Sequence, residues 1–125
     1  MYVEWRWEWS IEILPQMLWA TLNTFLAAGV GYAIAAIVGI LFMLGQRTSY
    51  KIINIPTREI VEFIRSTPLL VQLFFVYFVA PQFGLTLSAW VCAMITIGLH
   101  YGTYLSEVYR GALEGVPKTQ WEACR

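Results

Sequence analysis

The hydrophobic and polar positions of this chain form long apolar blocks separated by short polar ones. From Ile13 to Gln46 the chain contains no charged residue, a run of about 34 residues. As a helix this run would be about 50 Å long, whereas the hydrocarbon core of a bilayer is about 30 Å thick. The pattern therefore predicts a membrane-spanning helix at about 20–44, within a run that tilts, bends or extends beyond the hydrocarbon core.

Two further apolar blocks follow the first. One covers about 60–80 and contains Thr67, a predicted N-cap residue, followed by Pro68 at the predicted first helical position. The other covers about 87–106. Between them, residues 81–88 include a proline and a glycine and no charge, which predicts a short turn. The chain thus reads as one partial all-α membrane domain over 1–125, with three transmembrane helices.

Small side chains recur at every fourth position of the first predicted span. They are Ala27, Gly31, Ala35 and Gly39. Residues four apart lie on one face of a helix, and small residues there let a second helix approach closely. We expect this helix to pack against protein along the stripe, and we expect substitutions at Ile34 and Ile37 to matter less.

The segments that flank the first span have mixed character. Residues 1–12 alternate aromatic and charged side chains. This fits a β-strand or, as we favour, an interfacial segment with tryptophan and tyrosine at headgroup depth. Within residues 46–65 a short helix is predicted after Pro56, with apolar residues on one face and Arg58 and Glu62 on the other. We interpret this segment as an amphipathic elbow on the membrane surface.

Composition supports the membrane interpretation. Hydrophobic residues make up 58% of the 125 residues and charged residues 13%, whereas soluble domains carry about 25% charged residues. A soluble domain of this size could not bury so much apolar surface. The formal net charge is zero, so no basic excess points to nucleic acid. Cys92 and Cys124 are expected to be free thiols.

The distribution of basic residues predicts the orientation of the chain. Seven of the eight lysines and arginines lie within residues 46–65 or after Leu105. Short loops rich in lysine and arginine stay in the cytoplasm. We therefore expect the N-terminus and the 81–88 turn outside, and the elbow and the C-terminus in the cytoplasm.

Two polar residues inside the predicted spans are candidates for a substrate path. Gln72 lies in the second span, and His100, the only histidine, lies in the third. Polar groups at membrane depth are costly and often functional. The alternative for both is a structural contact, which we favour for His100 because Tyr101 and Tyr104 are close to it in the sequence. No second metal-ligating residue stands near His100, so no metal site is expected.

The last segment, residues 107–125, is polar and broken. Glu107 and Arg110 are three residues apart, a spacing that predicts an ion pair on one helix face. Gly115 and Pro117 are expected to end that helix, so that a new one begins at about Lys118. No stretch of the chain resembles a nucleophile–base arrangement or a phosphate-binding glycine loop, so we expect neither enzymatic activity nor a cofactor.

Three stretches resemble the permease subunits of ABC importers, in the polar amino-acid uptake family. Residues 65–78, RSTPLLVQLFFVYF, resemble the signature of that family's second helix. Residues 104–111, YLSEVYRG, and 116–123, VPKTQWEA, resemble the start of its cytoplasmic EAA coupling loop. Thr119 replaces the usual glycine and Cys124 the second alanine. His100 and Tyr101, together with residues 107–110, EVYR, further resemble the ectoine and hydroxyectoine permeases.

The resemblance implies a permease subunit in the bacterial inner membrane for polar amino acids or related zwitterionic solutes. The chain would be the N-terminal part of a five-span fold. Partners implied are a cytoplasmic ATPase subunit, a second permease subunit, identical or different, and an external solute-binding protein. The residues implied in ATPase coupling are Glu107, Arg110, Gly111, Pro117, Gln120, Glu122 and Ala123. The alternative from another class is a small membrane scaffold of three spans that transports nothing.

Overall fold

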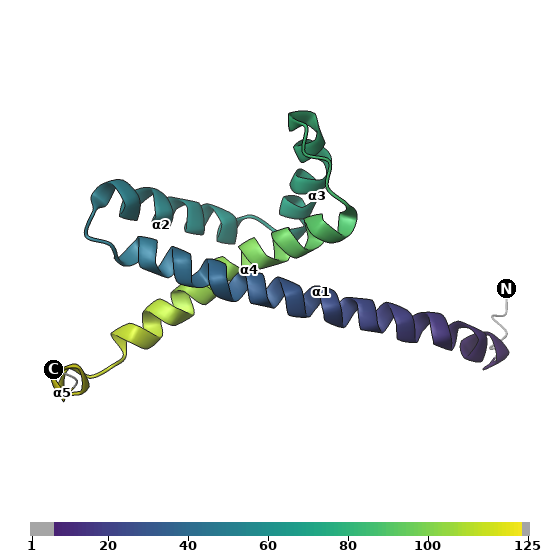
Figure 1. The fold of residues 1–125 in the computed structure, drawn as a ribbon, viewed down its shortest axis with the longest axis horizontal. Helices are drawn as coiled ribbons and strands as arrows, with labels where there is room; N and C mark the ends of the chain where they lie inside the picture. Colours follow the sequence, from purple (N-terminus) through teal and green to yellow (C-terminus); the bar gives the residue numbers. More distant parts are fainter. Residues whose placement is uncertain (1–6, 124–125) are drawn as a thin grey trace.

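A computed structural model describes residues 7–123, apart from the side chains of 118, 121 and 123. This part of the chain is helical and contains no strand (Figure 1). It therefore has the all-α architecture that the apolar blocks predict. The helices are α1 (Trp7–Arg47), α2 (Lys51–Ser66), α3 (Leu69–Val79), the 3-10 turn η1 (Ala80–Phe83), α4 (Ala89–Glu114) and α5 (Lys118–Ala123).

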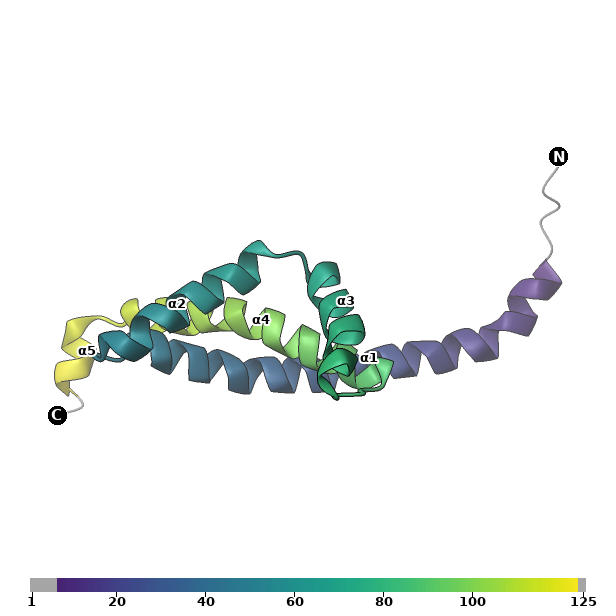
Figure 2. The same ribbon diagram turned by 90° about the horizontal axis from the view of Figure 1, so that it is seen from above.

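Helix α1 is one continuous helix of 41 residues, about 60 Å long at about 1.5 Å per residue. A strand is therefore wrong for residues 7–12, and residues 1–6 lie outside the described part. Figure 2 shows the N-terminal end of α1 bending away from the line of the rest. Pro15 lies in this end, and a proline inside a helix removes one backbone hydrogen bond. Among the described helices, α1 is long and apolar enough by itself to cross a bilayer.

The second apolar block folds as two helices, α2 and α3, whose axes differ in direction by 103°. Helix α2 and the segment formed by α3 and η1 meet the length and composition of a span only when taken together. The block predicted over about 60–80 is therefore bent between Ser66 and Leu69, and its crossing of the membrane stays a prediction. Thr67 is not the N-cap of the second helix. Its backbone is extended, as the residue before Pro68 favours, and its hydroxyl donates to the carbonyl of Phe63 at 2.8 Å. Thr67 thus ends α2, and Pro68 occupies the N-cap position of α3.

Helix α2 begins at Lys51, before Pro56 rather than after it. The Asn54 side chain donates to the carbonyl oxygens of Gln46 and Thr48, which ties the start of α2 to the end of α1. The chain turns sharply between the two helices, at the place where these two bonds lie. The elbow therefore runs back beside α1 and α4 instead of continuing away from them (Figure 1).

Helices α1 and α4 form the main packing contact, and both views show them lying along each other. On α1, Gly31, Ala35 and Gly39 are buried and Ala27 is half-buried, which confirms the small-residue stripe over its last three positions. Gly98 and Gly102 on α4 face it: a Cβ at Gly98 would lie 2.4 Å from Cγ2 of Ile34. At Gly102 it would lie 2.7 Å from Cγ1 of Val38. Each helix thus offers small residues to the branched side chains of the other.

Helix α4 follows a short connection in which Gly84 has a positive φ of 82°. The Ser88 hydroxyl accepts a hydrogen bond from the Val91 amide, which caps the start of α4. The helix then continues to Glu114, past the end predicted for the third span. Gly115 is its C-cap and α5 begins at Lys118, as expected from the glycine and proline between them. Whether α3 and α4 each span the membrane stays a prediction.

Candidate functional site

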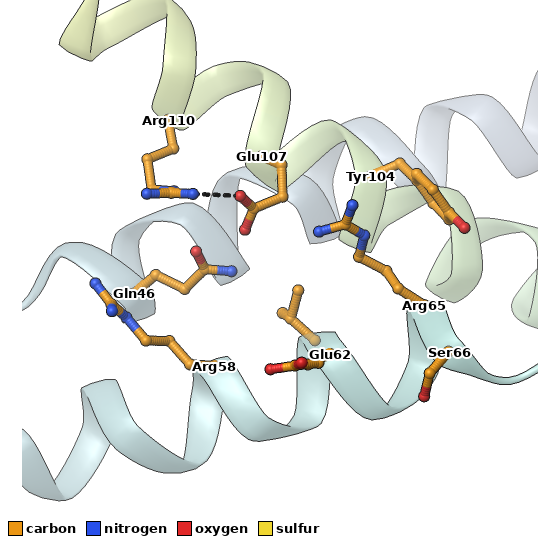
Figure 3. Close-up of a pocket in the computed structure, with 9 residues that line it drawn as sticks. Gln46, Arg58, Glu62, Arg65, Ser66, Tyr104, Glu107 and Arg110 are labelled. Carbon is orange, nitrogen blue, oxygen red and sulfur yellow. Dashed lines mark hydrogen bonds and ion pairs between the residues drawn. The ribbon is translucent and has the colours of Figure 1, made fainter.

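Polar side chains gather where the C-terminal end of α1, the middle of α2 and the later part of α4 come together (Figure 3). Gln46, the last but one residue of α1, is only 3% exposed. Its Nε2 donates to the Ser106 hydroxyl at 3.4 Å, and that hydroxyl donates to the Thr103 carbonyl at 2.6 Å. The chain of bonds fixes the end of α1 against α4.

Glu107 and Arg110 form the ion pair that their spacing predicts. Nη2 of Arg110 lies 2.5 Å from Oε2 of Glu107, and Nη1 lies 3.5 Å from the Glu114 carboxylate. The hydrogen bond from Arg110 holds the pKa of Glu107 below its usual value, against the opposing effect of burial. The Gln46 amide and the charge of Arg65 act in the same direction. Glu107 therefore carries its negative charge throughout the neutral range.

Helix α2 contributes arginines to the same place, and this was not anticipated from the sequence. Arg58 and Arg65 line a hollow of about 540 Å³ together with Gln46, Tyr104, Glu107 and Arg110, with Val61, Glu62 and Ser66 at its α2 side. The Arg65 guanidinium lies 5.0 Å from the centre of the Tyr104 ring. A spacing of seven residues puts Arg58 and Arg65 on one face of α2. That spacing is a signal in the sequence, but it does not show that this face of α2 meets α4.

Gln72, one of the two substrate-path candidates, lies in the first turn of α3. Its Nε2 donates to the carbonyl of Ile64 at 2.6 Å and to that of Thr67 at 2.9 Å. Both acceptors belong to the end of α2, so the side chain bridges the bend. Gln72 also lines an apolar hollow of about 350 Å³, which does not include His100.

His100, the other candidate, is buried in α4 with 8% of its surface exposed. Its ring lies edge-on to Tyr101 at 5.3 Å and tilted against Tyr104 at 5.2 Å, the two contacts considered from the sequence. Its Nδ1 is buried and has no hydrogen-bond partner among the described residues. The structure therefore does not bring Gln72 and His100 to one site.

The expected coupling residues fall into two groups. Glu107 and Arg110 belong to the polar cluster, and Gly111 lies one turn further along α4, where its carbonyl accepts from the Gly115 amide at 3.0 Å. Pro117 separates the helices, and its carbonyl accepts from the Gln120 amide at 3.0 Å. In α5 the side chains of Gln120 and Glu122 are exposed, whereas that of Ala123 is outside the described part. Figure 1 shows α5 at the far end of α4, away from the other helices.

Comparisons with known proteins point in one direction. No protein-family model matches the chain. The chain is 38% identical over 118 residues to a probable amino-acid ABC transporter permease, y4tG, of Sinorhizobium fredii, a match that covers 93% of this chain and 50% of the relative. It is 33% identical over 125 residues to the nopaline transport system permease NocM of Agrobacterium fabrum, a match that covers 92% of this chain and 52% of that relative.

A solved structure agrees in fold. A crystal structure of an amino acid ABC transporter with histidines superposes with a TM-score of 0.73 at 26% identity, over 90% of this chain and 56% of that one. The chain spans about half the length of the relatives it matches. In sequence and in fold, it is a homologue of the amino-acid ABC transporter permeases.

Proposed function

We propose that this chain forms part of the permease of an ABC importer that moves polar amino acids, or related zwitterionic solutes, across the bacterial inner membrane. The observation that carries the proposal is the short helix α5, held away from the other helices behind Pro117 and exposing Gln120 and Glu122. A helix end of this kind offers a polar surface to a partner outside the membrane. Relatives that match nearly all of this chain are named as probable amino-acid ABC transporter permeases, which argues against a scaffold that transports nothing.

The proposal assigns roles to the other residues. Glu107, Arg110 and Gly111 hold the end of α4 from which the coupling segment projects, and Gln120, Glu122 and Ala123 dock on a cytoplasmic ATPase subunit that hydrolyses ATP. A solute-binding protein delivers the solute from outside, and a second permease subunit completes the path. The orientation follows the basic residues, with the N-terminus outside and the C-terminus in the cytoplasm.

Of the two substrate-path candidates, His100 is the stronger. Its Nδ1 is unsatisfied among the described residues, whereas the Gln72 amide already donates to two carbonyl groups. A solute with a carboxylate or hydroxyl group would give Nδ1 a partner once the remaining helices close the path. The solved relative is described with histidines, which have such a carboxylate.

Glu122→Lys tests the proposed docking. The complete transporter is assembled with its ATPase and binding protein, and uptake, stimulation of ATP hydrolysis by binding protein and co-purification of the ATPase are measured. Reversing a charge at a docking surface should reduce co-purification about tenfold, equivalent to about 1.4 kcal/mol of binding free energy. Uptake should fall with it, while membrane insertion stays unchanged.

The matched control is Glu59→Lys, which makes the same charge change at an exposed position of α2. It should leave all three measurements within about twofold of the wild type. If Glu122→Lys also left them there, Glu122 would not take part in docking. Equal losses for both variants would point to a general effect of charge instead.

A further inference from the structure

The hollow between α1, α2 and α4 holds more positive than negative charge. It is lined by the guanidinium groups of Arg58, Arg65 and Arg110 and by the carboxylates of Glu62 and Glu107. Three cations against two anions leave one net positive charge around a space of about 540 Å³. Figure 3 shows the arginines entering it from two different helices.

The donor groups of these arginines are only partly used. Glu107 is paired with Arg110, whose Nε is nevertheless buried without a hydrogen-bond partner among the described residues. Within that same part of the chain, neither Arg58 nor Arg65 forms an ion pair. Arg65 stacks over Tyr104, which leaves the edge of its guanidinium available. Buried polar groups are almost always satisfied, so the Nε of Arg110 lacks an acceptor here. Arg58 and Arg65 are exposed, and they line the same hollow.

The face of α2 opposite to Arg58 and Arg65 is apolar and exposed, and it indicates the surroundings of this helix. Ile52, Phe63 and Ile60 are 86%, 70% and 49% exposed, and helical periodicity puts them on the side away from Arg58 and Arg65. A helix packed on a protein in water turns its apolar face inward. Here α2 buries Val61 against the other helices, Arg58 and Arg65 are exposed at the rim of the hollow, and a second apolar face points outward, as expected of a helix lying on a membrane surface. The arginines then lie at the depth of the headgroups.

From this arrangement we propose that the hollow binds the phosphodiester headgroup of a monoanionic phospholipid. The planar guanidinium fork donates two parallel hydrogen bonds to phosphate oxygens, which a lysine does not do. The Nε2 of Gln46, which makes a long bond to Ser106 and also acts on Glu107, is a further donor at the same place. One net positive charge matches the single negative charge of the phosphodiester, and the apolar face on the far side of α2 keeps this helix at the depth of the headgroups.

The experiment measures lipid retention. The chain is reconstituted into nanodiscs of equimolar phosphatidylglycerol and phosphatidylcholine, extracted in mild detergent, and the ratio of the two lipids retained is determined by native mass spectrometry. The wild type should retain phosphatidylglycerol preferentially. Arg58→Gln should lower the ratio about tenfold, because a charged hydrogen bond to phosphate contributes about 1.5 kcal/mol or more. The lipid ratio for Arg58→Lys should lie between those of the wild type and Arg58→Gln.

Two further variants separate the site from general charge and from misfolding. Arg47→Gln removes the same charge at an exposed position that does not line the hollow, and it should change the ratio less than twofold. Glu62→Gln removes a carboxylate from the lining and should raise the ratio above that of the wild type. An increase of that kind cannot come from loss of folding.

Inorganic phosphate distinguishes the source of the anion. If about 10 mM phosphate displaces the retained lipid from the wild type but not from Arg58→Gln, the site takes phosphate groups in general, and the assignment to lipid alone is overturned. The whole proposal is overturned if the wild type shows no preference, if Arg47→Gln matches Arg58→Gln, or if Glu62→Gln lowers the ratio.

Discussion

At Gln72 a single side chain joins two helices that the backbone separates. Because Pro68 cannot donate a backbone hydrogen bond, the carbonyl groups at the end of α2 have few backbone donors; that of Ile64 accepts from the Thr67 amide at 3.3 Å. The Gln72 amide supplies donors to two of these carbonyl groups, as a second partner for that of Ile64 and as a partner for that of Thr67. In an apolar environment an unsatisfied carbonyl is costly, so this residue has a structural role whether or not solute passes near it.

Gln72→Leu should destabilise the bend between α2 and α3. The loss of two hydrogen bonds to backbone carbonyls is expected to cost about 1–2 kcal/mol. Unfolding of the chain in mixed micelles, followed by circular dichroism during titration with sodium dodecyl sulfate, measures the change. Gln82→Leu, at an exposed position of η1, is the control and should be close to neutral. Equal stability of the Gln72 variant and the wild type would contradict the bridging role.

At the scale of helices, the contact between α1 and α4 depends on complementary shapes. The glycines of α4 accept branched side chains of α1, and the glycines of α1 accept side chains of α4: Gly31 lies against Ile97, and Gly39 against Leu105 and Tyr109. Ile34 belongs to this interface, since it packs on Gly98, and the expectation that it would matter less was wrong. Ile37, with 63% of its surface exposed, lies outside it as expected.

Gly98→Ala should weaken the contact, because the new methyl group would meet Ile34 at 2.4 Å. Overpacking of this kind costs about 1–3 kcal/mol, which the same titration measures. In the double variant Gly98→Ala with Ile34→Ala, the contact with Cγ2 is removed, although Cβ of residue 34 would still lie 2.7 Å away. The clash is thus partly relieved, and the cost should be smaller than the sum of the two single changes. Gly98→Ala with Ile37→Ala should instead be additive. If both pairs were additive, Ile34 would not be the reason why residue 98 must be small.

At the scale of the whole molecule, the helices diverge from one packed region. The N-terminal part of α1 extends beyond α4, and α5 projects at the other end (Figures 1 and 2). Much of the apolar surface is exposed, including Trp19, Phe25 and Phe75. Such surface suits lipid or further helices, and the chain spans only about half the length of its relatives. The membrane orientation should therefore be tested directly.

Single cysteines test that orientation. They are introduced at Ser49 and at Gln82, both exposed, in a background with Cys92→Ser and Cys124→Ser. Gln82→Cys should react with an impermeant thiol reagent in intact cells, whereas Ser49→Cys should react only after permeabilisation, since basic segments stay in the cytoplasm. The reverse pattern would overturn the predicted orientation.

The sequence by itself determined the features that depend on neighbouring residues. The charge-free run from Ile13 to Gln46 is helical, the Glu107–Arg110 spacing gives an ion pair, and the break before Lys118 follows from a glycine and a proline. In each case the cause lies within a few residues of the effect. The resemblance to amino-acid permeases was likewise carried by short motifs and is supported by the comparisons.

Only the tertiary structure decided which distant groups meet. Helix α2 starts at Lys51, before Pro56 and earlier than its local pattern indicates, and the Asn54 side chain ties this start to the end of α1. The arginines of α2 reach Glu107 and Tyr104 because α2 folds back beside α4. The contact between Arg65 and Tyr104 joins residues some forty positions apart, and no local periodicity specifies it. These contacts arise because the helices bury their small and polar faces against one another and leave the apolar faces outside.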